Sequence, residues 1–109
     1  MHQYSATVMW SEGEIPIETG KYSREHKWMF DNNITIPASS SPLLVPLPYS
    51  NENCVDPEES LIASASSCHM LTFLYLAYTQ KIYVYKYVDH AVGQMGKNNN
   101  GKEYISIII

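Results

Sequence analysis

The sequence carries little positive charge. Lysine and arginine together number 7 against 11 acidic residues, which gives a formal net charge of −4 at pH 7. No segment gathers the basic residues into a stripe, so the electrostatic footprint of a nucleic-acid-binding protein is missing. The sequence therefore predicts no nucleic-acid partner.

Cysteine is equally scarce. Only Cys54 and Cys68 occur, without a Cys-x-x-Cys motif, and the histidines show no ligand spacing. Two thiols cannot form a Cys-rich zinc site by themselves, so we expect no metal site. The N-terminal MHQYSATVMW lacks the basic and apolar regions of a signal peptide. We therefore expect a cytoplasmic protein whose thiols stay reduced unless they are catalytic or redox-sensing.

What is present predicts an α+β fold in a single domain over residues 1–109. Alternation and β-branched or aromatic content predict strands within residues 4–10, 27–36, 81–95 and 102–109. Asn32 and Asn33 tolerate the positive φ of a tight hairpin, and NNNG at 98–101 is a turn signal. Residues 37–57 carry five of the six prolines, which predicts a long, shaped loop.

The segment DPEESLIASASSCHMLTFLYLA, residues 56–77, predicts one long helix. Asp56 suits the N-cap, Pro57 the first helical position, and Glu59 completes a capping box. The pattern continues to about Thr79 and favours a central helix buried on most sides. Its length also suits a membrane span, but the serines, the histidine and the missing basic flanks argue against one, and we expect no membrane partner.

Five small residues, 63–67, lead directly to Cys68. Either the thiol is an inert core residue, or a second backbone or a substrate comes close to its sulfur. Cys68 lies too far along the helix to benefit from the N-terminal dipole, so a basic side chain must stabilise a thiolate there. Arg24 is the only arginine, and Glu58 is a carboxylate that could aim it. Ten helical residues separate Glu58 from Cys68 by about 15 Å, so a bridging arginine or a bent helix start is needed.

These residues resemble a known family. DPEESLIASASSCHMLTFL, preceded by TGKYSREHKWMFDNNITIPASSSP, is similar to the OsmC/Ohr family of cysteine-dependent hydroperoxide reductases, in its OsmC-like branch. The family places its reactive cysteine ten positions after the glutamate of a Pro-Glu pair, as Glu58 and Cys68 are placed here. The resemblance implies an intertwined homodimer in which an antiparallel sheet accompanies the long central helix, with active sites at the subunit interface.

The resemblance also implies a chemistry. Cys68 would attack an organic hydroperoxide and become a sulfenic acid, while Arg24 and Glu58 polarise the peroxide and stabilise the thiolate. No cofactor is bound, and a dithiol reductant, such as a lipoylated protein, would restore the thiol. The leucines of PLLVPLPY and the nine tyrosines are candidates for an apolar substrate pocket, although most of the tyrosines suit strand packing.

The sequence departs from the family in one respect. Family members continue beyond the strand at 102–109 into a further strand and a helix that carries a resolving cysteine. We expect these to be missing here, which leaves Cys54 as a resolving thiol only if its loop folds over Cys68. The alternative is a non-catalytic or degenerate OsmC-like protein that binds a hydrophobic ligand. For His69 we expect a structural role in the core or at an interface.

Overall fold

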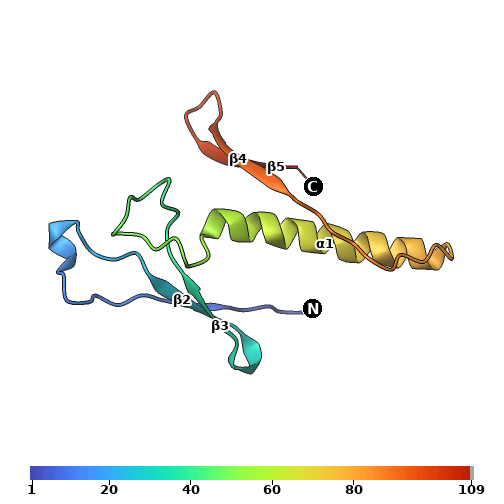
Figure 1. Cartoon of the computed structure of the whole chain (residues 1–109), viewed down its shortest axis with the longest axis horizontal. Coiled ribbons are helices and arrows are strands. Elements are labelled where there is room, and N and C mark those ends of the chain that lie inside the picture. Colours follow the sequence, from blue (N-terminus) through green and yellow to red (C-terminus); the bar gives the residue numbers. More distant parts are fainter. Residues whose placement is uncertain (109) are drawn as a thin grey trace. The chain divides into compact units, whose positions relative to one another are not determined.

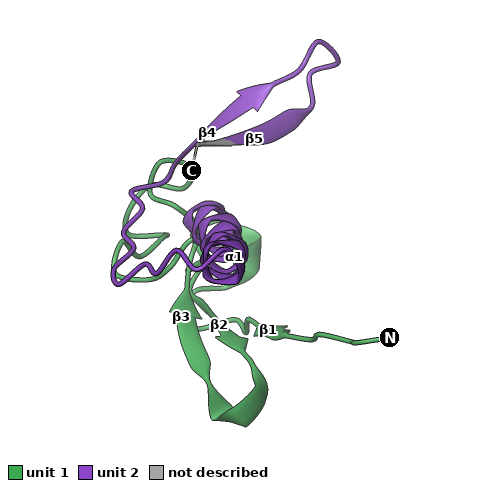
Figure 2. Cartoon of the chain, turned by 90° about the vertical axis from the view of Figure 1, so that its right-hand side faces the viewer, with its two compact units in different colours: residues 1–57 green, residues 58–109 purple. Residues whose placement is uncertain are grey.

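The computed structural model describes residues 1–108, and the chain divides into two compact units, residues 1–57 and 58–109 (Figures 1 and 2). The elements are β1 (Thr7–Met9), η1 (Ile17–Thr19), β2 (His26–Met29), η2 (Asp31–Asn33), β3 (Thr35–Ala38), α1 (Pro57–Thr79), β4 (Val92–Lys97) and β5 (Glu103–Ile108), where η marks a short 3-10 helix. Strands that precede and follow one long helix in the sequence confirm the predicted α+β class.

The first unit is built on an antiparallel sheet in the order β1-β2-β3. Its register places Trp28 of β2 opposite both Val8 and Ile36. The hairpin between β2 and β3 is confirmed, because Asn32 and Asn33 adopt φ values of 60° and 62°. Asparagine tolerates this left-handed conformation better than most residues do, so the two asparagines let the chain reverse here.

The proline-rich segment begins slightly later than predicted, because Pro37 and Ala38 belong to β3. Proline is tolerated there because β3 lies at the edge of its sheet, where its missing N–H disrupts no ladder. The loop then returns to this edge. The N–H of Val55 donates to the Pro37 carbonyl at 3.1 Å, and that of Ser39 donates to the Val55 carbonyl at 2.9 Å. Both ends of the loop are thereby anchored at the end of β3.

Helix α1 runs without interruption from Pro57 to Thr79, as predicted, with Glu58 and Glu59 in its first turn. The prediction that it is buried on most sides is wrong for the chain by itself, because Ala77 is its only buried residue. Within the second unit, the rest of the chain covers α1 along one side only. Large apolar side chains therefore stay exposed on the helix: Leu61, Leu71, Phe73, Tyr75, Leu76 and Tyr78. By length and composition α1 could also cross a membrane, with a mean hydropathy of 1.3, a test that core helices of soluble proteins pass as well.

The strand predicted over residues 81–95 is largely wrong. Only its last four residues belong to β4, and residues 82–91 pair with no strand among residues 1–108. This segment instead follows α1 (Figure 1), as the rings of Phe73 and Tyr87 show with centroids 6.0 Å apart. A strand needs a neighbouring backbone to pair with. This segment lies against the side chains of a helix, so it forms no strand here.

The chain then forms the predicted hairpin of β4 and β5. Its turn is closed where the N–H of Gly101 donates to the Asn98 carbonyl at 2.9 Å, and Gly101 adopts a φ of 76° that suits glycine. Gly93 of β4 approaches Ile62 of α1 so closely that a Cβ on the glycine would lie 2.3 Å from the Ile62 Cδ1 atom. Ile109, at the end of the predicted last strand, lies outside the described residues.

Candidate functional site

Cys68 lies in the middle of α1, and its side chain is exposed. Helical periodicity places Leu61, Leu71 and Tyr75, which are also exposed, on the same side of the helix. The thiol therefore sits on an open, largely apolar face of the chain, not in a core. A side chain in such a place is accessible to a substrate, which an inert core cysteine is not.

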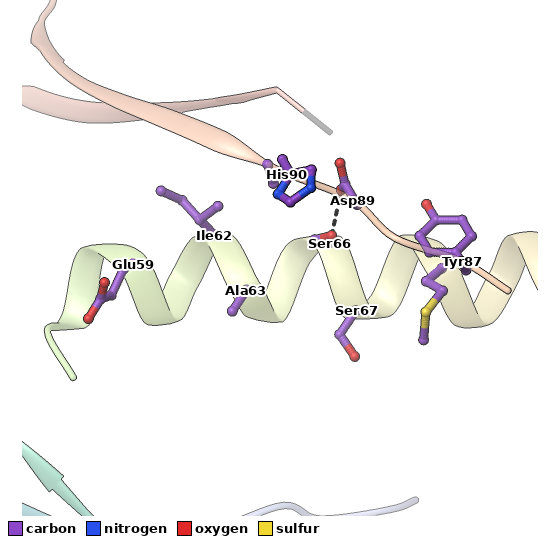
Figure 3. Close-up of a pocket in the computed structure, with 10 residues that line it drawn as sticks. Glu59, Ile62, Ala63, Ser66, Ser67, Tyr87, Asp89 and His90 are labelled. Atoms are coloured by element: carbon purple, nitrogen blue, oxygen red, sulfur yellow. Dashed lines mark hydrogen bonds between the residues drawn. The ribbon is translucent and has the colours of Figure 1, made fainter. Parts of the chain in front are cut away.

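A cavity of the second unit lies on another side of α1. It measures about 490 Å³ and lies between the helix and the segment around residues 87–91 (Figure 3). Ser66 donates a hydrogen bond to the Asp89 carboxylate there, at 2.6 Å between Oγ and Oδ2, with Tyr87 and His90 nearby. Ser66 is two residues from Cys68, a rotation of about 200° around the helix. The cavity is thus separate from the thiol.

Glu58 occupies the first turn of α1. Its Oε2 atom is buried and has no hydrogen-bond partner among the described residues. Because α1 is continuous and straight (Figure 1), Glu58 and Cys68 remain about 15 Å apart along the axis, and the alternative of a bent helix start is wrong. Buried carboxylate oxygens usually accept a hydrogen bond, and the long side chain of an arginine is a suitable donor.

Arg24 lies in the first unit, between a turn at Gly20, where φ is 74°, and the start of β2. Its guanidinium carbon lies 3.7 Å from the centroid of the Tyr22 ring. Its Nη1 donates to the carbonyls of Gly20 at 3.3 Å and Tyr22 at 2.5 Å, and its backbone N–H donates to the Tyr49 carbonyl at 2.9 Å. These contacts hold Arg24 within its own unit, and its approach to Glu58 and Cys68 stays a prediction.

Cys54 lies in the first unit and is half-buried in the loop that returns to β3. Burial raises the pKa of its thiol, and the nearby Glu25 carboxylate raises this pKa further. Both effects favour the protonated thiol, whereas the thiolate is the form that attacks another sulfur. The chemistry of Cys54 therefore works against the predicted resolving role, which no contact in the structure tests.

Two polar pairs were not predicted from the sequence. One is Ser66 with Asp89, and the other is Trp28 with His26, whose nitrogens Nε1 and Nε2 lie 3.2 Å apart. The second pair had a signal, because residues two apart on a strand share a face. Among residues 1–108 no three metal-ligating side chains gather in one place, and the expected lack of a metal stays a prediction.

The architecture is that of an α+β protein whose long, uninterrupted helix presents one exposed thiol. Comparison with family models finds no match for this chain, and comparison with curated proteins finds none either. A solved structure does match: an OsmC-like protein of unknown function from Vibrio cholerae. It is 42% identical with a TM-score of 0.92, and the match covers 99% of this chain and 75% of that one. The chain belongs to the OsmC-like family.

Family membership confirms the predicted fold and bears on α1. Because the match covers 99% of this chain, α1 lies within the part that matches the OsmC-like structure. The cytoplasmic location, the single domain and the expected loss of the C-terminal strand and helix stay predictions.

Proposed function

We propose that this protein is a thiol-dependent peroxidase that reduces organic hydroperoxides through Cys68. The observation that carries the proposal is the exposed thiol of Cys68 on the central helix of an OsmC-like fold. Glu58 supports the proposal, because its buried Oε2 atom has no hydrogen-bond donor among the described residues. The supply of that donor by Arg24 is part of the proposal.

The reaction oxidises the thiol by two electrons. The Cys68 thiolate attacks one peroxide oxygen, the O–O bond breaks, and the other oxygen leaves as an alkoxide that takes up a proton to become an alcohol. Cys68 is left as a sulfenic acid. The Arg24 guanidinium balances the negative charge on the sulfur and then on the leaving oxygen, and Glu58 aims the guanidinium.

A dithiol restores the enzyme, and no bound cofactor is required. One thiol of the reductant attacks the sulfenic sulfur and forms a mixed disulfide, while the hydroxyl leaves as water. The second thiol of the same molecule then attacks the mixed disulfide, which closes the reductant's own disulfide and releases Cys68. A lipoyl-type dithiol is suited to this step because its two thiols are close together.

We propose that the active form is a homodimer. In the single chain only Ala38 and Ala77 are buried among the apolar residues whose burial is described, whereas Leu71 and Tyr75 beside Cys68 are 61% and 66% exposed. An exposed apolar surface on this scale is typical of a face that another subunit covers. The thiol would then lie at the subunit interface, where the covered surface excludes water from the reaction.

The proposal is tested by treating the purified protein with one equivalent of cumene hydroperoxide in the presence of a sulfenic-acid trap and locating the adduct by mass spectrometry. We expect the adduct at Cys68 in the native protein and in Cys54→Ser, and no peroxide consumption by Cys68→Ser. Full consumption by Cys68→Ser would refute the proposal. A rapid Cys54–Cys68 disulfide would instead assign Cys54 the resolving role.

A second candidate function rests on a cavity of about 420 Å³ in the second unit, lined by Leu74, Tyr78, Ile82, Tyr83, Val84 and Tyr85. Its aliphatic and aromatic lining suits a hydrophobic ligand and favours a binding protein whose Cys68 is not recycled. Sustained turnover of peroxide with dihydrolipoamide as reductant excludes that function. A single turnover followed by inactivity supports it.

A further inference from the structure

The two hydrogen bonds of His26 indicate which nitrogen of its neutral ring carries the proton. The Trp28 Nε1 atom lies 3.2 Å from His26 Nε2, and an indole nitrogen can only donate, so Nε2 is the acceptor and carries no proton. The other ring nitrogen, Nδ1, lies 2.8 Å from the carbonyl oxygen of Arg24. That oxygen can only accept, so Nδ1 carries the proton. The two contacts therefore define one tautomer of the neutral ring, with the proton on Nδ1.

This histidine completes a set of contacts around Arg24. The Arg24 N–H donates to the Tyr49 carbonyl, and the Arg24 carbonyl accepts from His26, so both backbone groups are fixed. The guanidinium rests on the Tyr22 ring. His26 and Trp28 lie on β2, which pairs with β1 on one side and β3 on the other. The support for Arg24 thus comes from the central strand of the sheet, which is paired on both sides.

We propose that His26 is a positioning residue, which holds the Arg24 main chain through its Nδ1–H while Trp28 fixes its tautomer; this rests on the role of Arg24 in the proposed peroxidase. In the proposed reaction the Arg24 guanidinium acts on the Cys68 thiolate from the end of a long side chain, so a displacement of the Arg24 backbone also displaces the guanidinium. Small displacements of a charged donor reduce its effect on a reacting thiolate.

The other groups near His26 leave this assignment intact. It shares a cavity of about 300 Å³ with the titratable Glu25, Lys27 and Cys54. The remaining lining, from β1 and β3 and the residues next to them, is not titratable: Met9, Trp10, Ser11 and Pro37. Glu25 Oε1 accepts from the Asn51 amide at 2.8 Å, so this carboxylate already has a donor. The donor that decides the tautomer is therefore Trp28.

Two amide variants separate the two bonds of the ring. The amide nitrogen of asparagine occupies the place of Nδ1, so His26→Asn keeps a donor for the Arg24 carbonyl and loses the acceptor for Trp28. The longer His26→Gln places its amide oxygen near Nε2, which keeps the Trp28 bond and loses the donor to Arg24. Neither side chain titrates, and both have the same functional group.

The measurements are kcat/KM for cumene hydroperoxide with dihydrolipoamide and the Cys68 pKa, obtained from the pH dependence of alkylation in a Cys54→Ser background. Loss of one hydrogen bond in His26→Gln should lower kcat/KM by about threefold to tenfold and raise the Cys68 pKa. His26→Asn should keep kcat/KM within about twofold of the native value, because one bond to Arg24 remains. Equal behaviour of the two variants overturns the inference.

Arg24→Met separates failure of this inference from failure of the proposed function. If Arg24→Met leaves both kcat/KM and the Cys68 pKa unchanged, the proposed role of Arg24 itself is wrong. If Arg24→Met impairs both while the Asn and Gln variants behave alike, only the positioning role is wrong. Where an amide variant does not fold, His26→Ala removes the donor to the Arg24 carbonyl, and an unchanged Cys68 pKa and kcat/KM in His26→Ala overturn the inference.

Discussion

The two units of this chain are stabilised in different ways. The first unit connects its segments with polar contacts, such as the hydrogen bond that Trp10 Nε1 donates to the Ser23 carbonyl at 2.9 Å. Of the four residues that are buried among those whose burial is described, it holds three: Ala38, Ser39 and Ser50. The second has Ala77 as its buried residue and leaves most of its large apolar side chains exposed. Large apolar side chains are also exposed in the first unit, among them Val8, Phe30 and Leu44, so the two units differ in their polar anchoring and not in whether they leave apolar surface open.

The residues of the proposed reaction are also divided between the two units. Arg24 lies in the first unit, where carbonyls and the Tyr22 ring hold it, and Cys68 lies on the open face of α1 in the second. A preorganised cation and an accessible nucleophile are complementary requirements, since the cation must not reorganise during the reaction and the thiol must admit a substrate. Each unit supplies one of them.

The largest expected effect is on Glu58, the first residue of the second unit. Glu58→Gln should lower kcat/KM for cumene hydroperoxide by about tenfold or more, because an amide cannot form the ionic pair with Arg24. Its neighbour Glu59→Gln is the matched control. Both substitutions remove one charge from the first turn of α1 and cost about 0.3–1 kcal/mol of helix stability. Steady-state kinetics checks this, and equal losses in the two variants would assign Glu58 a role at the helix start alone.

The next prediction concerns the open face of the second unit. Leu71→Asp should weaken dimerisation at least about tenfold, because burying a leucine contributes about 1.5–3 kcal/mol and a charge in its place opposes association. Leu43→Asp is the control, since Leu43 is 96% exposed in the loop of the first unit. Sedimentation equilibrium of the two variants distinguishes them. If Leu71→Asp stays dimeric at the concentration of the native protein, another face forms the interface.

Local sequence signals were sufficient for much of this fold. Pro57 and the uninterrupted run after it defined α1, and Asn32 and Asn33 defined the first hairpin, because each signal acts within a few residues. The small residues beside Cys68 left open whether the thiol is an inert core residue or is approached by another group, and the structure shows its side chain exposed in this chain. The helix and the hairpin depend on local backbone preferences, which the sequence carries directly.

The predictions that failed concern features that depend on tertiary contacts. Alternating residues in 82–91 have the pattern of a strand, but pairing depends on a backbone neighbour that periodicity does not specify. The burial of α1 was misjudged because its apolar pattern does not say whether the cover belongs to this chain or to another. The support of Arg24 by His26 was missed because it depends on which nitrogen of the ring faces which neighbour.

A smaller effect should follow from close packing in the second unit. In Gly93→Ala the new Cβ would lie 2.3 Å from Cδ1 and 2.7 Å from Cγ1 of Ile62, so the isoleucine must move. We expect a loss of about 1–2 kcal/mol in the free energy of unfolding, which Ile62→Val reduces by removing the contacting methyl. Gly13→Ala in the first unit is the control, with nothing within 4 Å of its Cβ. Chemical denaturation measures all three, and an equal cost for both glycines would refute the close approach.

The smallest expected effect is on the reactivity of Cys54, the thiol of the first unit. Burial and the Glu25 carboxylate raise the pKa of Cys54, so Glu25→Gln should lower this pKa toward its ordinary value while burial keeps part of the shift. Glutamine keeps the oxygen that accepts from Asn51, so the loop stays attached. In a Cys68→Ser background, iodoacetamide near pH 8 should then alkylate Cys54 about two- to threefold faster, because the thiolate fraction increases. Glu52→Gln removes a charge from the loop that carries Cys54 and should leave the alkylation rate unchanged. Equal acceleration by both variants would mean that net charge, and not the proximity of Glu25, sets the pKa of Cys54.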